Sequence, residues 1–208
     1  MSDLRTIHLV DDDEAIRHSA SFLLRHSGFR VKTYADGVTF LDQVETAERG
    51  CILLDVQMPV MDGLEVQEAL NARGVSMPVI VLTGHGDVGV AVRAMKAGAV
   101  DFVEKPYAKQ SLVDALTRAF ERLEARQKVE VLAEEARGLI ARLTAREKQV
   151  LLGLVEGQTN KVIAETLDVS PRTIEIHRAN LMDKMNAQSL STVLRIAFAA
   201  GYGAAGDA

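Results

Sequence analysis

Apolar and polar positions follow two different periods along the front half of this chain. Short apolar runs rich in β-branched residues predict five strands, at Thr6–Val10, Arg30–Tyr34, Cys51–Leu54, Val79–Leu82 and Val100–Glu104. Apolar residues at helical spacing predict helices between them, at Glu14–Ser27, Asp36–Ala47, Gly63–Ala72, Val88–Ala97 and Lys109–Leu123. Because the central strands are almost continuously apolar, we expect a doubly wound α/β domain with a five-stranded parallel sheet.

The rear of the chain shows helical spacing only, which predicts an all-α domain. The expected helices are Thr144–Glu156, Asn160–Leu167, Pro171–Met185 and Ser189–Ala200. With the connector between the two halves, this gives three parts: 1–122, 123–142 and 143–208.

The connector carries two apolar stripes at three- and four-residue steps. One ends at Leu123 and the other starts at Val129, which is one residue short of a heptad. We therefore expect the stripe to rotate around the helix near Glu124–Lys128, or the helix to break there, and Gly138 is a second weak point. The connector is either a solvated helical linker or a surface that pairs with a second copy.

Composition favours folded domains in a reducing compartment. Of the 208 residues, 48% are hydrophobic, which is enough to bury a core. The single cysteine, Cys51, excludes an internal disulfide framework and a multi-cysteine zinc site. No apolar run approaches the ~18 residues of a membrane span, and the N-terminus lacks a basic signal-peptide region. We expect a soluble, cytoplasmic protein with no membrane partner.

Acidic residues gather in the front half. The net charge is −5, and residues 1–120 carry 12 basic and 17 acidic side chains, whereas residues 121–208 carry equal numbers. Asp11, Asp12 and Asp13 follow the first strand directly, and Asp55 follows the third. Because ligands bind outside the carboxyl ends of the strands in such sheets, these carboxylates are expected to share a pocket that suits Mg²⁺. The simpler interpretation, a helix cap by Asp12 or Asp13, leaves Asp55 unexplained.

Two further strand ends carry groups that suit a phosphoryl ligand. Thr83 ends the fourth strand, and Lys105-Pro106 follows the fifth. A lysine ammonium and a threonine hydroxyl can both donate hydrogen bonds to phosphoryl oxygens. Each residue alone would be ordinary, but the ordered set at successive strand ends indicates a phosphate-handling site.

These residues resemble the receiver domain of bacterial two-component response regulators, over residues 1 to about 122. The matching residues are Val10-Asp11-Asp12, Asp55 with Met58-Pro59 and Asp62-Gly63, Thr83-Gly84 and Lys105-Pro106. Asp13 and the segment Thr83-Gly84-His85-Gly86-Asp87 are similar to the FixJ-type subgroup. The resemblance implies that Asp55 accepts a phosphoryl group from a sensor histidine kinase, with its carboxylate as nucleophile.

The same resemblance implies roles for the neighbours of Asp55. Asp12 would bind Mg²⁺ directly, Asp11 through water and Gln57 through its backbone carbonyl. Thr83 and Lys105 would contact the phosphoryl oxygens. Phe102 stands at the position of the family's switch aromatic, which turns inward on activation; the alternative is an ordinary core aromatic.

Two helices of the rear half are joined by a short turn at Asp168–Ser170. Ser170 is a good N-cap and Pro171 a good first residue for the second helix. That helix would turn Ile174, Leu181 and Met185 inward. It would leave five polar residues available on its outer side, namely Arg172, Thr173, Glu175, Arg178 and Lys184. The pattern indicates a helix-turn-helix, whose second helix enters the DNA major groove, although any small helical bundle has apolar faces of this kind.

Residues 140–201 resemble the LuxR/GerE-type helix-turn-helix. The resemblance rests on Leu143-Thr144-Ala145-Arg146-Glu147, Gly157 through Ile163 and Ser170 through Met185. It implies contacts with base edges by Glu175, Ile176 and Ala179, and with phosphates by Lys161, Arg172, Thr173, His177 and Arg178. Because residues 143–200 carry seven basic and six acidic side chains, one copy should bind DNA weakly, and dimerisation should decide whether the site is occupied.

The sequence thus predicts a phosphorylation-activated transcription factor and not an enzyme. Phosphorylated Asp55 would rearrange Val88–Glu104, which would pair with a second copy and bring two output domains to promoter DNA, with RNA polymerase as a further partner. Two alternatives stay open on the residues alone. One is a Mg²⁺-dependent phosphatase or phosphotransferase, and the other is an adaptor whose helical half binds a protein.

Overall fold

The structure is a computed structural model that describes residues 5–84 and 88–203. His85, Gly86 and Asp87 of the FixJ-like segment lie outside the described residues. The chain divides into two compact units, Met1–Ala125 and Arg126–Ala208. No helix within the described ranges is long and apolar enough to cross a membrane.

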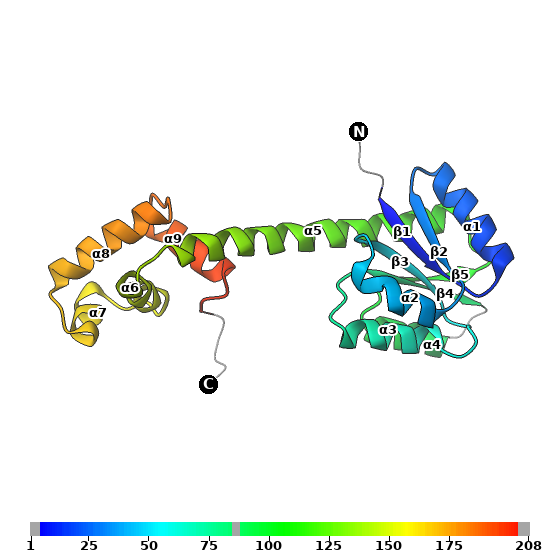
Figure 1. The fold of residues 1–208 in the computed structure, drawn as a ribbon, viewed down its shortest axis with the longest axis horizontal. Helices are drawn as coiled ribbons and strands as arrows, with labels where there is room; N and C mark the ends of the chain where they lie inside the picture. Colours follow the sequence, from blue (N-terminus) through cyan, green and yellow to red (C-terminus); the bar gives the residue numbers. More distant parts are fainter. Residues whose placement is uncertain (1–4, 85–87, 204–208) are drawn as a thin grey trace. The chain divides into compact units, whose positions relative to one another are not determined.

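The first unit contains a five-stranded parallel sheet in the order β2-β1-β3-β4-β5 (Figure 1). Its strands are β1 (Thr6–Val10), β2 (Arg30–Tyr34), β3 (Gly50–Asp55), β4 (Val79–Gly84) and β5 (Asp101–Lys105). They agree with the predicted strands to within two residues at each end. In the register between β1 and β3, Val10 lies opposite Leu54, so Asp11 is level with Asp55. The chain reverses its winding direction between these two strands, which is where doubly wound sheets bind ligands.

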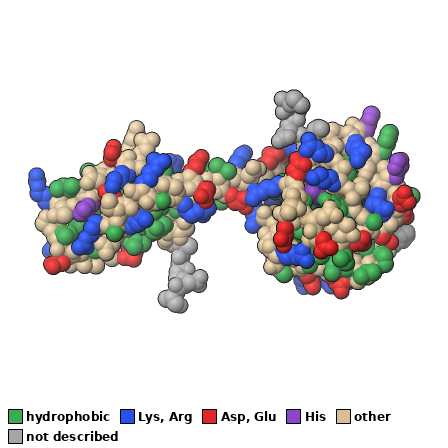
Figure 2. Space-filling view, viewed as in Figure 1, with side chains coloured by type: hydrophobic (Ala, Val, Ile, Leu, Met, Phe, Trp, Pro, Cys, Tyr) green, Lys and Arg blue, Asp and Glu red, His purple; other side chains and the backbone are tan. Residues whose placement is uncertain are grey.

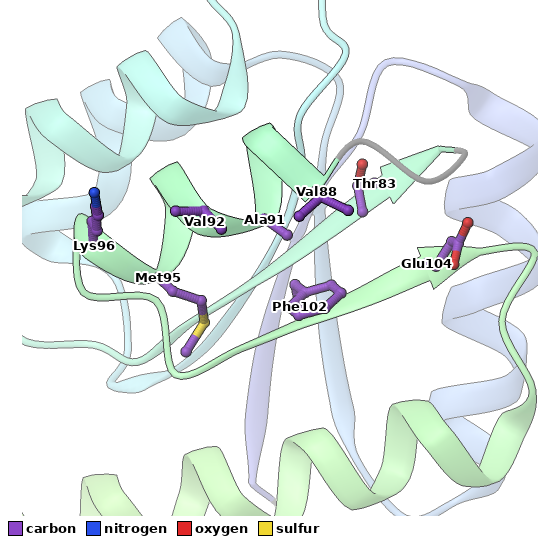
Figure 3. Close-up of a pocket in the computed structure, with 8 residues that line it drawn as sticks. All are labelled: Thr83, Val88, Ala91, Val92, Met95, Lys96, Phe102 and Glu104. Atoms are coloured by element: carbon purple, nitrogen blue, oxygen red, sulfur yellow. The ribbon is translucent and has the colours of Figure 1, made fainter.

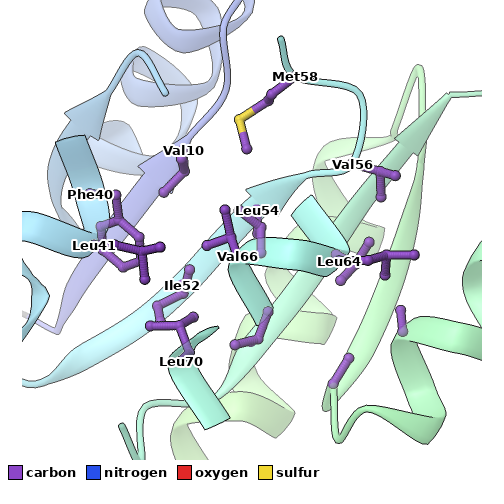
Figure 4. Close-up of a cluster of buried hydrophobic side chains, with 14 of the residues drawn as sticks. Val10, Phe40, Leu41, Ile52, Leu54, Val56, Met58, Leu64, Val66 and Leu70 are labelled. Atoms are coloured by element: carbon purple, nitrogen blue, oxygen red, sulfur yellow. The ribbon is translucent and has the colours of Figure 1, made fainter. Parts of the chain in front are cut away.

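Helices cover both faces of this sheet. They are α1 (Glu14–His26), α2 (Gly37–Gln43), α3 (Gly63–Ala72), α4 (Val88–Lys96) and the start of α5 (Lys109–Ala141). One buried cluster joins α2, α3 and α4 to the sheet, as the packing of Phe40, Leu64 and Leu70 shows in Figure 4. A second cluster joins α1 and α5 to the other face. The predicted helix Asp36–Ala47 ends earlier than expected, because its last turn tightens into a 3₁₀ helix, η1 (Val44–Thr46).

Helix α5 runs without interruption from Lys109 to Ala141. The break considered near Glu124–Lys128 does not occur, and Gly138 does not end the helix. The stripe rotates instead: Leu116 is buried on the sheet, whereas Val129 and Leu132 are 66% and 58% exposed. A segment without proline and rich in Ala, Leu, Glu, Arg and Lys has enough helix propensity to continue through the change of phase.

The second unit continues with four helices, α6 (Ala145–Val155), α7 (Asn160–Leu167), α8 (Pro171–Lys184) and α9 (Leu190–Ala199). Each begins at a Ser or Thr whose side chain accepts a backbone N–H: Thr144, Thr159, Ser170 and Ser189. One buried cluster packs α6 and α9 against the C-terminal half of α8, and another packs α6 and α7 against its N-terminal half. These four helices confirm the all-α fold expected for the rear of the chain, and the compact unit also includes the end of α5 from Arg126 onwards.

Candidate phosphorylation site and nucleic-acid surface

Asp55 ends β3 in a pocket where a lysine bridges two buried carboxylates. The Nζ atom of Lys105, at the end of β5, lies 2.6 Å from Oδ2 of Asp11 and 2.9 Å from Oδ1 of Asp55. Asp11 is fully buried and Asp55 is 5% exposed. The order of the strands therefore brings together three charged groups that are 44 to 94 residues apart in the sequence.

The turn between β1 and α1 gives its three aspartates different tasks. The backbone N–H of Asp13 donates to Oδ1 of Asp11 over 3.0 Å. The carboxylate of Asp13 caps α1 by accepting from the backbone N–H groups of Ala15 and Ile16. Since Asp13 is the cap, Asp12 is left exposed beside the pocket. Arg17 holds the turn from α1, because its Nη1 donates to the Asp11 carbonyl over 2.7 Å.

The carboxylates of Asp11, Asp12 and Asp55 fit a hard divalent cation. Each offers an oxygen, and these oxygens all lie within 4.8 Å of one another. Gln57, whose carbonyl was predicted as a further ligand, follows β3 two residues after Asp55 and is exposed. Mg²⁺ prefers carboxylate and carbonyl oxygens and keeps several waters, so the donor set agrees with the predicted magnesium site.

The pocket holds more negative than positive charge, because the carboxylates of Asp11, Asp12 and Asp55 share one ammonium, that of Lys105. Burial raises the pKa of Asp55; the carboxylates of Asp11 and Asp12 act in the same direction, and Lys105 opposes them. Burial lowers the pKa of Lys105, but hydrogen bonds to Asp11 and Asp55 outweigh it, so that pKa lies above its usual value. One ammonium therefore faces three carboxylates, and a bound cation would relieve the remaining repulsion.

The loop after Asp55 needs a glycine at its far end. A Cβ atom on Gly63 would lie 2.2 Å from the backbone oxygen of Asp55, closer than any real side chain allows. Asp62 and Glu65 form a capping box that starts α3 immediately beside this contact. The Asp62-Gly63 pair thus lets α3 begin directly against the backbone of the candidate phosphoacceptor.

Thr83 and Phe102 lie at an apolar hollow between α4 and β5 (Figure 3). Thr83 is buried, and its hydroxyl donates to the Gly84 carbonyl over 3.2 Å. Phe102 is 45% exposed, so the alternative of an ordinary core aromatic is wrong. The hollow has a volume of about 390 Å³ and is also lined by Val88, Val92 and Met95, which are exposed as well. Phe102 lines this open hollow itself, so its half-exposed ring has space to change its orientation.

Helices α7 and α8 present part of the predicted DNA-contacting set to solvent, with Lys161 on α7 and the other residues on α8. Among the predicted residues, those exposed are Lys161, Arg172, Glu175, Ile176 and Ala179, and those half-buried are Thr173, His177 and Arg178. The hydroxyl of Thr173 is 2.8 Å from that of Ser170, so it takes part in the cap of α8. Nη1 of Arg178 donates to the side-chain carbonyl of Asn160, at the start of α7. Arg178 therefore joins α7 to α8 and is less available than the sequence suggested.

Lys184 was expected to be available on the outer side of α8, but in the structure it is paired with a residue of α6. Its ammonium is 2.7 Å from Oε2 and 2.9 Å from Oε1 of Glu147, a buried residue of α6. Glu147 also accepts from the Thr144 N–H at the start of α6. The Thr144-x-x-Glu147 pattern of a capping box could have indicated the cap from the sequence, but the partner of Glu147 on α8 follows only from the packing of the helices.

Both halves match known protein families. The response regulator receiver domain matches residues 7–117, and the family described as bacterial regulatory proteins, luxR family, matches residues 141–197. The transcriptional regulatory protein FixJ of Azorhizobium caulinodans is 46% identical over 208 residues, which cover 100% of this chain and 99% of that protein. The chain belongs to the FixJ-type response regulators.

Further relatives match this response regulator over most of its length. The tetrathionate response regulatory protein TtrR of Salmonella typhimurium is 41% identical over 92% of this chain and 91% of its own. Among solved structures, the response regulator StyR has a TM-score of 0.79 at 37% identity, covering 94% of this chain and 99% of that one. Full-length FixJ from B. japonicum has a TM-score of 0.60 at 44% identity, covering 95% and 97%.

These relationships establish the class of this response regulator. It is a DNA-binding regulator of transcription with a receiver domain and a LuxR-type helix-turn-helix domain, and it is not an enzyme. Its domains imply a histidine kinase and DNA as partners. The phosphatase and adaptor alternatives are thereby set aside.

Proposed function

We propose that this response regulator is switched by phosphorylation of Asp55 by a sensor histidine kinase. The observation that carries the proposal is the position of the Asp55 carboxylate. It lies at the winding reversal of the sheet, level with Asp11 and within 2.9 Å of the Lys105 ammonium. It is buried enough to be shielded from bulk water and yet borders the exposed Asp12.

In the proposed transfer, one carboxylate oxygen of Asp55 attacks the phosphorus of a phosphohistidine. A P–O bond forms and the P–N bond breaks, while the departing imidazole nitrogen keeps the electron pair and takes a proton. Asp11, Asp12, Asp55 and the Gln57 carbonyl would hold Mg²⁺, which when bound supplies positive charge for the phosphoryl oxygens. Lys105 remains beside Asp55, where its ammonium can donate to a phosphoryl oxygen.

Phosphorylation of Asp55 would then alter the surface formed by α4 and β5, through a movement of Thr83. To contact the phosphoryl group, the Thr83 hydroxyl must leave the Gly84 carbonyl to which it now donates. Phe102 would turn into the hollow beside Thr83, and the apolar surface of Val88, Val92 and Met95 would pair with a second copy. This is a shift between two conformations of one domain, driven by the bound phosphoryl group.

Pairing of receivers would bring two helix-turn-helix domains to adjacent half-sites of promoter DNA. In our proposal, α8 enters the major groove with Glu175, Ile176 and Ala179 towards the bases. Phosphates would be contacted by Lys161, Arg172, Thr173, His177 and Arg178. The regulator would act in the cytoplasm, where its DNA lies, and would affect transcription through RNA polymerase.

The test is the variant Asp55→Asn, compared with Asp42→Asn as a control at an exposed position. Both proteins are incubated with a radiolabelled small phosphodonor and Mg²⁺. We expect hydroxylamine-sensitive label on the wild type and on the control but none on Asp55→Asn, because an amide cannot form an acyl phosphate. Label that persists on Asp55→Asn would show that another residue is the phosphoacceptor.

A further inference from the structure

Helix α5 exposes an apolar stripe after it leaves the sheet. Ala125, Val129 and Leu132 are exposed and follow one another at steps of four and three residues. The next position of the same stripe, Ala136, is buried within the chain. The stripe is therefore open over about two helical turns, with the alternating three- and four-residue spacing of a two-stranded coiled coil.

Most of the remaining surface of this segment is charged. Glu121, Arg122, Glu124, Arg126, Lys128, Glu130, Glu134 and Glu135 occupy positions around the stripe, and side chains of both signs are visible along this part of α5 in Figure 2. Val131 is also exposed, at 50%, but it lies two residues from Val129 and hence on the opposite side of the helix. The exposed apolar residues of this segment are thus the stripe of Ala125, Val129 and Leu132, and Val131 on the opposite side of the helix.

We propose that this stripe pairs, in parallel register, with the same stripe of a second copy when the receivers dimerise. The inference rests on the proposed function, because it takes the phosphorylated protein to be a dimer. Charge complementarity favours a second copy as the occupant: in parallel register, Glu121 of one helix lies beside Arg126 of the other. Within one chain Arg126 already pairs with Glu130, 3.4 Å away on an exposed face, so its guanidinium remains within reach of a further carboxylate.

A parallel arrangement also agrees with the task of the output domains. Both copies of α8 must reach adjacent half-sites on one DNA duplex, so the two connectors have to leave the receivers in the same direction. An antiparallel pair would send the output domains to opposite ends of the dimer.

The stripe is too short to hold two chains together by itself. A stable interface buries about 1,200 Å² or more, and two turns of helix offer far less. Once the receivers are paired, however, the second contact forms at a high effective concentration. The connector pair is therefore conditional on receiver dimerisation, so it should form in the phosphorylated protein and not in the unmodified one.

Cysteine cross-linking tests the pairing directly. Val129→Cys places a thiol in the stripe, and Val131→Cys places one two residues away, on the opposite side of the same helix. The native Cys51 can stay, because it is fully buried and burial raises its pKa, so its thiolate is scarce. We expect the phosphorylated full-length Val129→Cys protein to form disulfide dimers at least five times faster than phosphorylated Val131→Cys or either unmodified protein.

A second pair of variants tests the energetic effect without a disulfide. Leu132→Glu puts a charge into the stripe, whereas Val131→Glu adds the same charge outside it. We expect Leu132→Glu to raise the dissociation constant of the phosphorylated dimer by about tenfold, since one large apolar contact per chain is lost. Val131→Glu should leave it within about twofold. Sedimentation measures both, with far-ultraviolet circular dichroism as the check on folding.

The possible results distinguish failure of the connector pairing from failure of receiver dimerisation. A phosphorylated protein that is dimeric but cross-links equally fast through positions 129 and 131 overturns the connector pair and leaves the proposed function intact. A phosphorylated protein that stays monomeric at all concentrations contradicts the dimerisation in the proposed function. Rapid cross-linking at position 129 together with an unchanged dimer constant in Leu132→Glu would mean proximity without stabilising contact, and that also overturns the inference.

Discussion

His8 lies fully buried in the middle of β1, three residues before Asp11. Its Nε2 is 2.8 Å from the Glu48 carbonyl, which can only accept, so Nε2 carries the proton. Its Nδ1 is 3.2 Å from the Tyr34 hydroxyl and accepts from it. Both ring nitrogens are therefore satisfied in the neutral form. Burial lowers the pKa of His8 and the Lys32 charge adds to this, while Glu48 acts in the opposite direction.

A histidine held neutral in this way makes the receiver sensitive to acid. The unfolded chain takes up a proton near the ordinary pKa of 6.5, whereas the folded chain does so only at lower pH. The contribution of neutral His8 to the free energy of unfolding is complete above pH 6.5, and it is lost as the pH falls towards the pKa of His8 in the folded chain. Each unit between the two pKa values costs about 1.4 kcal/mol of unfolding free energy.

We predict that His8→Gln flattens this pH dependence, because the amide can donate to Glu48 and accept from Tyr34 without titrating. Urea unfolding between about pH 7.5 and pH 5.5 measures the slope. The control is His18→Gln, which removes one imidazole from an exposed position. Equal slopes for the wild type and His8→Gln would show that His8 does not titrate differently on folding.

Among the helices, α8 combines two tasks on opposite sides. Its inner side carries Ile174 and Leu181 into the two clusters of the output unit, and Lys184 and Arg178 bind Glu147 and Asn160. These contacts hold the helix against α6 and α7. Its outer side leaves Glu175, Ile176 and Ala179 exposed, together with Arg172 in the first turn. The division explains why not every polar side chain on α8 is equally available to DNA.

Substitution of a predicted phosphate-contacting residue should affect DNA binding differently from substitution of a predicted base-contacting residue. Arg172→Ala should weaken binding to all DNA sequences alike and lower the slope of log affinity against log salt by about 0.9, since one phosphate contact is lost. Glu175→Ala should instead change the preference among sequences, because base edges carry the sequence information. Titration of a set of operator variants at several salt concentrations measures both. A change of base preference in Arg172→Ala alone would mean that the register of α8 on DNA is different.

At the scale of the whole chain, two compact units have different charge and different architecture. The surplus of acid lies in residues 1–120, whereas residues 121–208 are balanced. The output unit has its own two buried clusters, which include Ile140 and Leu143 but no residue of the receiver. It should therefore fold as a fragment without the receiver. Such a fragment tests whether the receiver restrains DNA binding or only adds a dimer contact.

We predict that the unphosphorylated receiver restrains DNA binding. Removal of residues 1–122 should give a fragment that binds operator DNA better than the unmodified protein. It should bind more weakly than the phosphorylated dimer, which holds two output domains at high effective concentration. Gel-shift titration of the three species gives the order. A fragment no better than the unmodified full chain would exclude inhibition, and phosphorylation would then act only by adding an interface.

Much of the architecture could be predicted from local patterns. Strand bounds such as Thr6–Val10 and helix bounds such as Gly63–Ala72 follow from periodicity and from caps such as Asp62, which act within a few residues. Parallel pairing follows from apolar strands alternating with helices, and it already places Asp11 and Asp55 at one edge. The continuity of α5 could not be predicted in the same way, because a stripe that changes phase is compatible with both a break and a rotation.

By itself, the sequence determined the order of strands and helices, the family and the residues that gather at the strand ends. It could do so because these properties depend on spacing along the chain. Only the tertiary structure decided that Lys105 bonds both Asp11 and Asp55, and that Phe102 is exposed at the hollow that Thr83 also lines. It also decided that Arg178 bonds Asn160 and that Lys184 bonds Glu147. Such contacts join residues 18 to 94 positions apart, and their geometry follows from how whole elements pack, which no local pattern contains.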